Sequence, residues 1–443
     1  MKNLKKAFLL PVFLSLLILF LSADDRRTDR TVLVIITLNC EFLWDGVAPE
    51  EGQVDFAWKG SKSEAEEHMQ NVAEIIAKAN PDIINLVEIE NETALNTFNT
   101  KFLAGRGYVP YFIQGKDTYT GEDVALLSRI DPEGSKIWRD DRKGQSGAVY
   151  KSVSKNYYAK FTLGDLQFTL IGVHFLAIPL QQSRVLEREA QARAIRAVAL
   201  ERKAEGYSVI ILGDFNDYDG ESTCLDHVGS MPVSNVLKIA KEMDASDGSD
   251  DLVNATSYIQ RESRYTAFWD ANQNGEIEPQ TDYTSIDHIL LSPALASRVE
   301  SVEIPHNHDP RIATDHFPVV VRLRTTDGGG QPSAPSLIRI KSLLPNPEGD
   351  EDLNEEAVIK NLGLQPVNLT GWKLRDLAGK TWSLNELGSL DRGQEKTIKR
   401  KGQSMALNNR GDTIALVDPF GQVIHSVTYA SAEEGEVIEC IIN

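Results

Sequence analysis

Short apolar runs recur along the first three quarters of the chain, and polar residues follow each run directly. Their length, their β-branched residues and the turn residues around them are typical of buried strands. The clearest runs are Val32–Ile36, Ile83–Val87, Phe168–Val173 and Ser208–Leu212. Between the last two, the segment Arg184–Arg202 interleaves Arg and Glu with apolar residues, which predicts an amphipathic scaffold helix with a mixed charged face.

The polar residues after these runs can carry phosphoester chemistry. In Gly213–Asp217, Asp214 and Asn216 lie two residues apart just after a strand. A carboxylate there could orient an attacking water, and an amide could donate a hydrogen bond to a charged phosphoryl oxygen. The other candidates, each at or near the end of an apolar segment, are Asn39, Glu88, His174, Asp287, Asp315 and His316.

Each of these residues alone has a plainer interpretation. A Glu at a strand end is usually solvated, an isolated His is more often a hydrogen-bonded core or rim residue, and Asp-His before Pro can be a simple turn. Five such motifs in one order along the chain are hard to reconcile with coincidence. Together they predict the site of a phosphodiesterase.

The motif set resembles that of the endonuclease/exonuclease/phosphatase superfamily, the DNase I-like proteins. The resemblance spans roughly residues 31–325 and is specific for the superfamily, although much less so for the substrate. It implies an α/β fold, a four-layered sandwich in which two mixed sheets pack face to face with helices outside. The site would lie at one edge of that sandwich, at strand ends and loops.

The resemblance also implies where a divalent metal would bind. Asn39 and Glu88 would belong to the metal end of the site, with Glu88 the principal ligand for Mg²⁺ or Mn²⁺, and Asp315 would lie near the ion. Mg²⁺ prefers such oxygen ligands and keeps several of its waters.

The remaining roles follow from the same resemblance. Asp214 would position or deprotonate the water, Asn216 would hold the phosphoryl oxygen and His174 would contact the scissile phosphate. Asp287 and His316 would form a carboxylate–imidazole pair, in which the negative charge favours the protonated ring. The sequence leaves open whether His316 acts as base or as phosphate-binding acid.

One position departs from the family pattern. Members commonly have Gln before the metal-binding Glu, whereas Val87 precedes Glu88 here. Glu90 would share a face with Glu88 in an extended strand, so it remains an alternative ligand.

A second metal site could lie in the loop that begins at Asp270. Oxygen side chains at alternate positions and Gly275 at the sixth match a calcium-loop pattern, but the twelfth position is Thr281 rather than Glu. A polar turn rich in Asn and Gly explains the segment equally well. The candidate calcium ligands are Asp270, Asn272, Asn274, Glu276 and Asp282.

The N-terminus predicts export. Three lysines precede a continuous apolar run from Ala7 to Leu21, followed by small residues and an acidic patch. Residues 1–23 therefore read as a secretory signal with cleavage after Ala23, and an uncleaved membrane anchor is the alternative. A secreted, periplasmic or cell-surface location follows.

Composition limits the substrate and the number of domains. The 443 residues exceed one ordinary domain, and 46 Lys and Arg against 65 Asp and Glu give a net charge of −19. This charge disfavours a tight, sequence-specific nucleic-acid binder. The strongest candidates for contacts to a nucleic-acid backbone are Arg139, Arg142 and Lys143 in a loop. With three cysteines, at most one disulfide could form.

A second domain follows a flexible linker. The catalytic domain is predicted over 30–325, the Gly- and Pro-rich linker over 326–335, and a small β-sandwich over 336–443. Strands are predicted at 337–340, 356–359, 372–374, 413–417 and 423–427, with the turn Asp418–Gly421 joining the last two. This region resembles the immunoglobulin-like lamin-tail domain, and Trp372 is expected in its core.

These patterns predict an exported, Mg²⁺- or Mn²⁺-dependent phosphodiesterase, most simply a nuclease acting on extracellular DNA or RNA without sequence preference. The C-terminal domain would tether or orient the enzyme, or contact nucleic acid, envelope or matrix. A sphingomyelinase-like phospholipid phosphodiesterase would need exposed aromatics near the site, for which the candidates are Trp44, Phe56, Trp58, Trp138 and Trp269. An inositol-phosphate phosphatase would need a denser Lys/Arg pocket, and a surface adhesive protein would need no intact site.

Overall fold

The computed structural model describes residues 24–224, 232, 234–244, 248–325, 338–363, 367–418 and 423–440. The predicted signal segment, the predicted linker and all but the first residue of the turn Asp418–Gly421 lie outside this part of the chain. None of the helices in the described ranges combines the length and the apolar composition that a membrane crossing requires.

The first sheet of the α/β part has six strands in the order β14-β15-β1-β2-β4-β3. Only its central pair, β1 and β2, is parallel, and every other neighbouring pair is antiparallel. In this order the strands are β14 (Val299–Glu303), β15 (Val319–Arg324), β1 (Val32–Leu43), β2 (Ile83–Ile89), β4 (Asp123–Ser128) and β3 (Val109–Phe112).

The second sheet has five strands in the order β10-β13-β9-β8-β7. Here too one central pair, β8 and β9, is parallel and the other pairs are antiparallel. In this order the strands are β10 (Val253–Asn254), β13 (Asp287–Leu291), β9 (Ser208–Asp214), β8 (Leu166–His174) and β7 (Lys155–Leu163).

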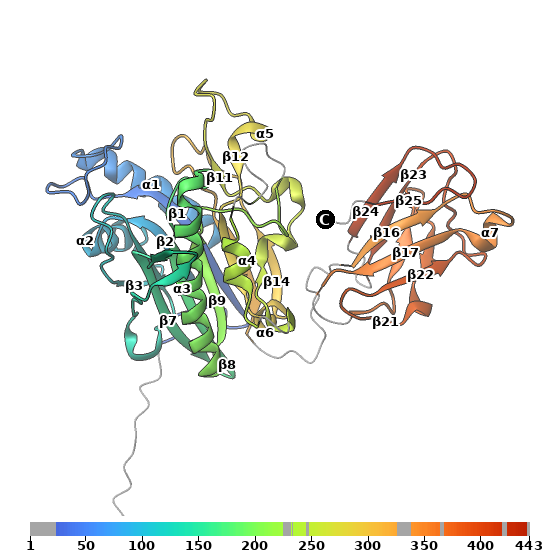
Figure 1. The fold of residues 1–443 in the computed structure, drawn as a ribbon, viewed down its shortest axis with the longest axis horizontal. Helices are drawn as coiled ribbons and strands as arrows, with labels where there is room; N and C mark the ends of the chain where they lie inside the picture. The colour runs from blue at the N-terminus through green and yellow to red at the C-terminus, as the bar shows by residue number, and fades with distance from the viewer. Residues whose placement is uncertain are drawn as a thin grey trace, which may run out of the picture.

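The two sheets pack face to face, with helices on the outside. On β1, Leu33 and Ile35 belong to the core between the sheets, whereas Val34 and Ile36 belong to the core beneath the outer helix α1 (Lys62–Ala79). This alternation explains why the strands read as continuous apolar runs, since both of their faces are buried. On the second sheet, α3 (Val185–Ala204) and α4 (Val236–Lys241) share a core with β8 and β9 (Figure 1). The predicted four-layered sandwich is confirmed.

Shorter elements complete the α/β part and position its loops. They are α2 (Glu92–Thr97), β5 (Gly144–Ser146), β6 (Val149–Lys151), β11 (Ala267–Phe268), α5 (Pro279–Asp282), β12 (Tyr283–Thr284) and α6 (Pro293–Ala296). The pairs β5–β6 and β11–β12 are small antiparallel ribbons outside the two main sheets.

The C-terminal part is an all-β sandwich around its own core. One sheet has the order β22-β17-β16-β25 and the other β20-β19-β23-β24, with β18 and β21 as a separate pair and α7 a single turn. The elements are β16 (Ile338–Leu344), α7 (Glu351–Asn354), β17 (Glu356–Asn361), β18 (Val367–Asn368), β19 (Lys373–Arg375), β20 (Thr381–Ser383), β21 (Ser389–Leu390), β22 (Glu395–Lys399), β23 (Asp412–Val417), β24 (Val423–Tyr429) and β25 (Ile438–Glu439). The predicted strands are present, and Trp372 is buried in the core as expected.

A second tryptophan is buried more completely than Trp372. Trp382 on β20 is fully buried, and its ring N–H donates to the Lys399 carbonyl. Replacing Trp382 with Ala leaves a large cavity and is expected to lower the free energy of unfolding of the sandwich by about 3–5 kcal/mol. Scanning calorimetry of residues 24–443 would show one transition moving to lower temperature. Leu377→Ala, at an 83% exposed position of the same domain, is the matched control, and an equal shift there would contradict the prediction.

Candidate active site

The two parallel strand pairs bring the candidate residues to one edge of the sandwich. Glu88 lies near the end of β2, while His174 and Asp214 end the neighbouring strands β8 and β9. In the second sheet, Asp214 is in register with His174 on one side and with Asp287, the first residue of β13, on the other. Carboxyl ends of parallel strands meet at the same sheet edge, so the pairing of the strands brings these side chains close together.

Gly213 explains why Gly precedes the central aspartate. Its φ is +139°, and a Cβ built there would lie 1.9 Å from the Val173 carbonyl oxygen on the adjacent strand. Only glycine allows this close approach of β9 to β8. The glycine thus sets the register that places Asp214 beside His174.

The first cluster consists of Asp214, Asp287 and His316, all buried, with one ligand atom of each within 4.8 Å of the others. His316 Nδ1 lies 2.7 Å from Asp287 Oδ2, which is the predicted carboxylate–imidazole geometry. The Thr266 hydroxyl fixes this aspartate by accepting its backbone N–H at 3.0 Å. Asp287 is therefore held by Thr266 at its backbone and by His316 at its side chain.

The charges in this cluster shift the pKa values of both His316 and Asp214. Burial opposes the charged ring, but Asp287 and Asp315 raise the pKa of His316 well above its usual value. Burial, and then the charge of Asp287, raises the pKa of Asp214. A protonated imidazole thus lies next to a carboxylate that has become a better base.

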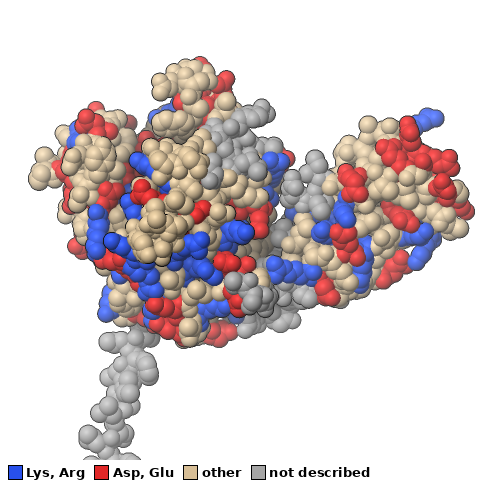
Figure 2. All heavy atoms as spheres, in the orientation of Figure 1, with Lys and Arg blue, Asp and Glu red and all other residues tan. Residues whose placement is uncertain are grey.

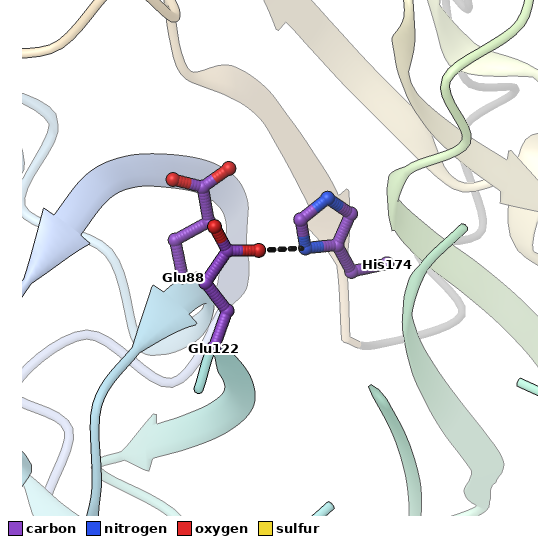
Figure 3. Close-up of side chains that lie close together, drawn as sticks. All are labelled: Glu88, Glu122 and His174. Carbon is purple, nitrogen blue, oxygen red and sulfur yellow. Dashed lines mark ion pairs between the residues drawn. The ribbon is translucent and has the colours of Figure 1, made fainter. Parts of the chain in front are cut away.

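The second cluster consists of Glu88, Glu122 and His174 (Figure 3). His174 Nδ1 lies 3.7 Å from Glu122 Oε2, and this buried nitrogen has no hydrogen-bond partner among the described residues. Burial, followed by the positive charge of Lys155, lowers the pKa of His174 well below its usual value. His174 is therefore neutral at physiological pH.

Asn39 and His174 join the two clusters into one site. The Asn39 amide nitrogen donates to Glu88 Oε1 at 2.8 Å and to Asp214 Oδ2 at 3.3 Å, while its oxygen accepts the Glu41 backbone N–H. On the other side, His174 Nε2 lies 3.7 Å from Asp214 Oδ2. The structure thus brings Asn39 to the metal end with its donor, rather than its oxygen, facing the carboxylates.

Asn216 has a left-handed backbone, with φ of 47°, a conformation that Asn tolerates well. Its backbone N–H donates to Asp214 Oδ1 at 2.7 Å, and its side-chain amide donates to the Phe175 carbonyl at 3.2 Å. A second amide hydrogen remains on the same nitrogen. The residue orients the aspartate and can still donate to a phosphoryl oxygen.

Asp315 lies at the more open end of the site. One of its carboxylate oxygens is 3.7 Å from His316 Nε2, and the side chain is 35% exposed. Its backbone N–H donates to Glu41 Oε2, and burial together with Asp315 raises the pKa of Glu41 to about 8. Glu41 is therefore a further carboxylate of the metal end that the sequence did not single out.

Glu122 and Lys155 are the other site residues that sequence reasoning missed. Lys155 Nζ lies 2.8 Å from Glu122 Oε2 in a buried ion pair. Glu122 directly precedes β4 and Lys155 begins β7, and the first residues of these antiparallel strands pair with the ends of β2 and β8. Charged residues just before an apolar run would have been the available signal.

The alternative ligand Glu90 does not reach either cluster. Its carboxylate oxygens accept the backbone N–H groups of Asp45 and Glu51 at 3.1 and 3.2 Å. The expectation that Glu88 and Glu90 share a face was wrong, because Glu88 has a φ of 64° and interrupts the pairing of β2. This strained conformation turns Glu88 alone toward the site.

The basic candidates Arg139 and Arg142 are occupied by acidic neighbours. Arg139 pairs with Asp141, and Arg142 pairs with both Asp140 and Glu201. Figure 2 shows Lys and Arg gathered over the face that carries α3, where many are ion-paired in the same way. Lys143 is exposed and has no ion pair with another described residue. A contact of these three residues with nucleic acid stays a prediction.

The loop at Asp270 forms a polar turn whose carboxylates bond to its own backbone. Asp270 accepts the N–H groups of Asn274 and Gly275, and the buried Asp282 accepts those of Ala271 and Glu278. Asn272 and Asn274 bond within the turn, and Glu276 is exposed. In the described ranges, converging groups of three metal-binding side chains occur only in the two clusters above. Calcium binding here stays a prediction.

The aromatic residues that a lipid-active enzyme would expose are mostly covered. Trp44 is fully buried, Trp58 stacks on His68 and Trp138 stacks on Tyr158. Phe56 stacks on Phe42 and is partly buried. Trp269 is the exception, at 63% exposed.

The donor set fits a hard divalent cation. Burial, then the charges of Glu122 and Asp315, raises the pKa of Glu88 well above its usual value, so a cation bound at this carboxylate would be favoured. The buried Asp287 Oδ1 has no hydrogen-bond partner among the described residues. Carboxylate oxygens of this kind suit Mg²⁺ or Mn²⁺. Glu88 and Asp315, whose charge acts on Glu88, could hold such an ion.

Comparison with known proteins gives two family matches. Residues 36–316 match the model of the Endonuclease/Exonuclease/phosphatase family, and residues 331–431 match that of the Lamin Tail Domain. The comparison with curated proteins gives no match.

Similar solved structures include the 3′–5′ exonuclease NExo from Neisseria meningitidis. It is 17% identical over 66% of this chain and 100% of its own, with a TM-score of 0.44. Family proteins from Bacteroides vulgatus (18% identity, 66% and 99% coverage, TM-score 0.42) and Bacteroides thetaiotaomicron (17%, 66% and 95%, 0.42) are also similar.

Proposed function

Because the chain belongs to the Endonuclease/Exonuclease/phosphatase family, we propose that it is an exported, divalent-metal-dependent phosphodiesterase that hydrolyses DNA or RNA. The observation that carries this proposal is the joining of both clusters around one buried aspartate. Asp214 lies between His174 and Asp287 and within hydrogen-bond reach of Asn39. A base, a neutral histidine and a protonated histidine thereby face one small volume.

Each residue then has a part in attack by water. Asp214 accepts a proton from the water, since its raised pKa makes it a stronger base than an ordinary aspartate. Asn216 donates to a phosphoryl oxygen, and the His316 imidazolium offsets the negative charge that develops there. His174, which lies beside Glu122, contacts the scissile phosphate. The water oxygen forms a new P–O bond, the P–O bond to the leaving sugar oxygen breaks, and that oxygen takes up a proton, which leaves one phosphate end and one hydroxyl end.

The metal end of the site is formed by Glu88 and Asp315. A bound Mg²⁺ or Mn²⁺ would polarise a phosphoryl oxygen as a Lewis acid. Glu88 is oriented for this by two donors, the Asn39 amide and the Phe42 backbone N–H, at 2.8 and 3.1 Å. The carboxylate therefore needs little reorganisation to bind an ion.

A diester substrate suits the site better than a phosphate monoester. The charged groups that act most strongly on Glu88, Asp214 and His316 are carboxylates and a histidine. The buried Lys155 is already paired with Glu122 and Asp117. A dianionic monoester would need more cations than this, whereas a diester carries one charge.

We place the enzyme outside the cytoplasm because its N-terminus resembles a secretory signal, and we assign the contact to envelope or matrix to the lamin-tail domain.

Plasmid hydrolysis by purified residues 24–443, with Mg²⁺ and with EDTA, tests the proposal. Metal-dependent nicking that is absent from an Asp214→Ala and His316→Ala double variant is the expected result. Sphingomyelin and inositol phosphates are assayed beside DNA and RNA. Hydrolysis of sphingomyelin or of inositol phosphates, but not of DNA or RNA, would refute the nucleic-acid substrate and keep the site. If no phosphoester is hydrolysed, the proposed enzyme activity is refuted.

Glu88→Gln is expected to weaken Mg²⁺ binding by at least about 100-fold, because the amide loses the charge that attracts the ion. The isosteric side chain keeps its packing but can accept only one of the two hydrogen bonds from Asn39 and Phe42, so the melting temperature without metal is measured beside the affinity. Isothermal titration with Mg²⁺ measures the effect. Unchanged affinity would show that the ion binds elsewhere.

A further inference from the structure

Trp269 is an exposed aromatic residue beside the active site. It is 63% exposed and directly follows the short strand β11, whose first residue forms a bridge with His316. The backbone N–H of Phe268 donates to the Asp315 carbonyl at 2.7 Å, and that of Trp269 donates to the Asp282 carbonyl at 2.8 Å. The backbone of Trp269 is therefore fixed next to Asp315, at the more open end of the site.

Ile178 is an exposed apolar residue shortly after His174, in the loop between β8 and α3. It is 53% exposed and has a φ of 65°, a left-handed conformation that is an outlier for a β-branched residue. The fully buried Arg188 holds this loop, because its guanidinium donates to the carbonyls of Ile178 and Pro179 at 3.2 and 2.6 Å. A strained backbone that the fold keeps in place is typical of a functional loop.

The charges next to these two residues do not favour a nucleic-acid duplex, which is bound mainly through its phosphates by Lys and Arg. In the loop after Trp269, the Gly275 carbonyl accepts from the guanidinium of Arg311 at 3.0 Å, and the same guanidinium bonds to Asp309 at 2.7 Å. Next to Ile178, Arg188 is buried and bonds to carbonyls. Both arginines already hold protein oxygens, so the exposed apolar side chains favour contact with bases over contact with phosphates.

The loop that carries Trp269 is also poorly suited to insertion into a lipid membrane. The residues that follow the tryptophan are mostly polar, and Asn272, Asn274 and Glu276 are exposed among them. Burying a carboxylate among acyl chains is costly. An aromatic ring with polar neighbours can instead stack on a base that is itself partly in water.

We propose that the site takes unpaired nucleic acid, and that Trp269 and Ile178 contact its bases on either side of the scissile phosphate. In the second sheet, His174 and Asp287 lie on opposite sides of Asp214. Ile178 follows that histidine, while β11, just before Trp269, pairs with β12, which leads into Asp287. In a single strand the faces of the bases are free to stack on a side chain. The inference rests on the proposed function, because it names the form of nucleic acid that this function would cleave.

Binding to a chain with the Asp214→Asn substitution tests the inference, because the bound strand then stays largely uncleaved. Fluorescence anisotropy with a labelled single strand and with its duplex, in Mg²⁺, gives both affinities for residues 24–443. We expect the single strand to bind at least about 10-fold more tightly than the duplex. Trp269→Leu should weaken binding of the single strand by at least about 5-fold, whereas Trp269→Phe, which keeps a stacking ring, should retain most of it.

Two results at Trp269 would overturn the inference and leave the proposed nuclease intact. One is tighter binding of the duplex, and the other is an equal loss in the Leu and Phe variants. Failure to bind either nucleic acid would refute the inference together with the nucleic-acid substrate. Sedimentation with vesicles of phosphatidylcholine and phosphatidylglycerol covers the lipid alternative, and vesicle binding that is lost in Trp269→Ala would also overturn the inference.

Ile178→Gly tests the second contact in a variant that is expected to fold, because Gly adopts a φ of 65° freely. We expect the affinity for the single strand to fall by at least about 3-fold, with a melting temperature that is not lowered. Leu377→Ala, at an exposed position of the C-terminal domain, is the control and should change neither quantity. Native affinity in a folded Ile178→Gly variant would overturn the contact with Ile178.

Discussion

Replacing Asp214 with Asn is expected to lower kcat for DNA hydrolysis by about 10³-fold, the usual scale for loss of a general base. Asn has the same shape, and its oxygen can still accept the Asn216 backbone N–H. It cannot take a proton from water. Burial and Asp287 raise the pKa of Asp214, so the native residue is suited to that transfer at neutral pH. Single-turnover cleavage with saturating Mg²⁺ isolates the chemical step.

Glu90→Gln is the matched control for this substitution. Glu90 is also a buried carboxylate at the same edge of the sandwich, and burial raises its pKa to about 7, but its oxygens bond to backbone N–H groups outside both clusters. The kcat of the Glu90→Gln variant should stay within a few-fold of the native value. An Asp214→Asn variant that keeps more than a tenth of native kcat would remove Asp214 from the role of base. Equal losses in both variants would indicate a general packing effect.

The sequence was most informative where a functional residue ends a buried strand. Glu88, His174 and Asp214 follow apolar runs, and parallel pairing brings such ends together by topology alone. The sandwich strands were found for a similar reason, because short apolar segments between turns leave few other interpretations. The core position of Trp372 was expected from the resemblance to the lamin-tail domain.

The residues that were missed depend on long-range antiparallel pairing. Glu122 reaches the site because β4 runs antiparallel to β2, and Lys155 because β7 runs antiparallel to β8. No local pattern states which strand a segment will pair with. The error at Glu90 has a different cause: a single left-handed residue, Glu88, changes which face the following side chains occupy. Backbone strain of this kind is stabilised by the folded surroundings and leaves no periodic signal.

The pH profile of Asp287→Asn should show whether His316 works as a cation. In the native protein, Asp287 and Asp315 keep the pKa of His316 well above its usual value, so the ring stays charged through neutral pH. With Asn at 287, the largest of the charges that raise the pKa of His316 is lost while burial still lowers it, so the ring becomes neutral at a lower pH than in the native protein. We expect kcat/KM to fall at least about 100-fold at pH 8, with a much smaller deficit near pH 6.

The direction of this change separates the two roles that a histidine could play. If His316 acted as a base, its neutral form would be the active one, and the variant would lose least at high pH. The effect on Asp214 does not reverse the expectation, because burial is the main cause of its raised pKa and Asp287 the smaller one. NMR titration of the His316 ring in both proteins measures the pKa directly. A ring that is charged at pH 8 in Asp287→Asn, with activity still lost, would assign Asp287 to orientation rather than to charge.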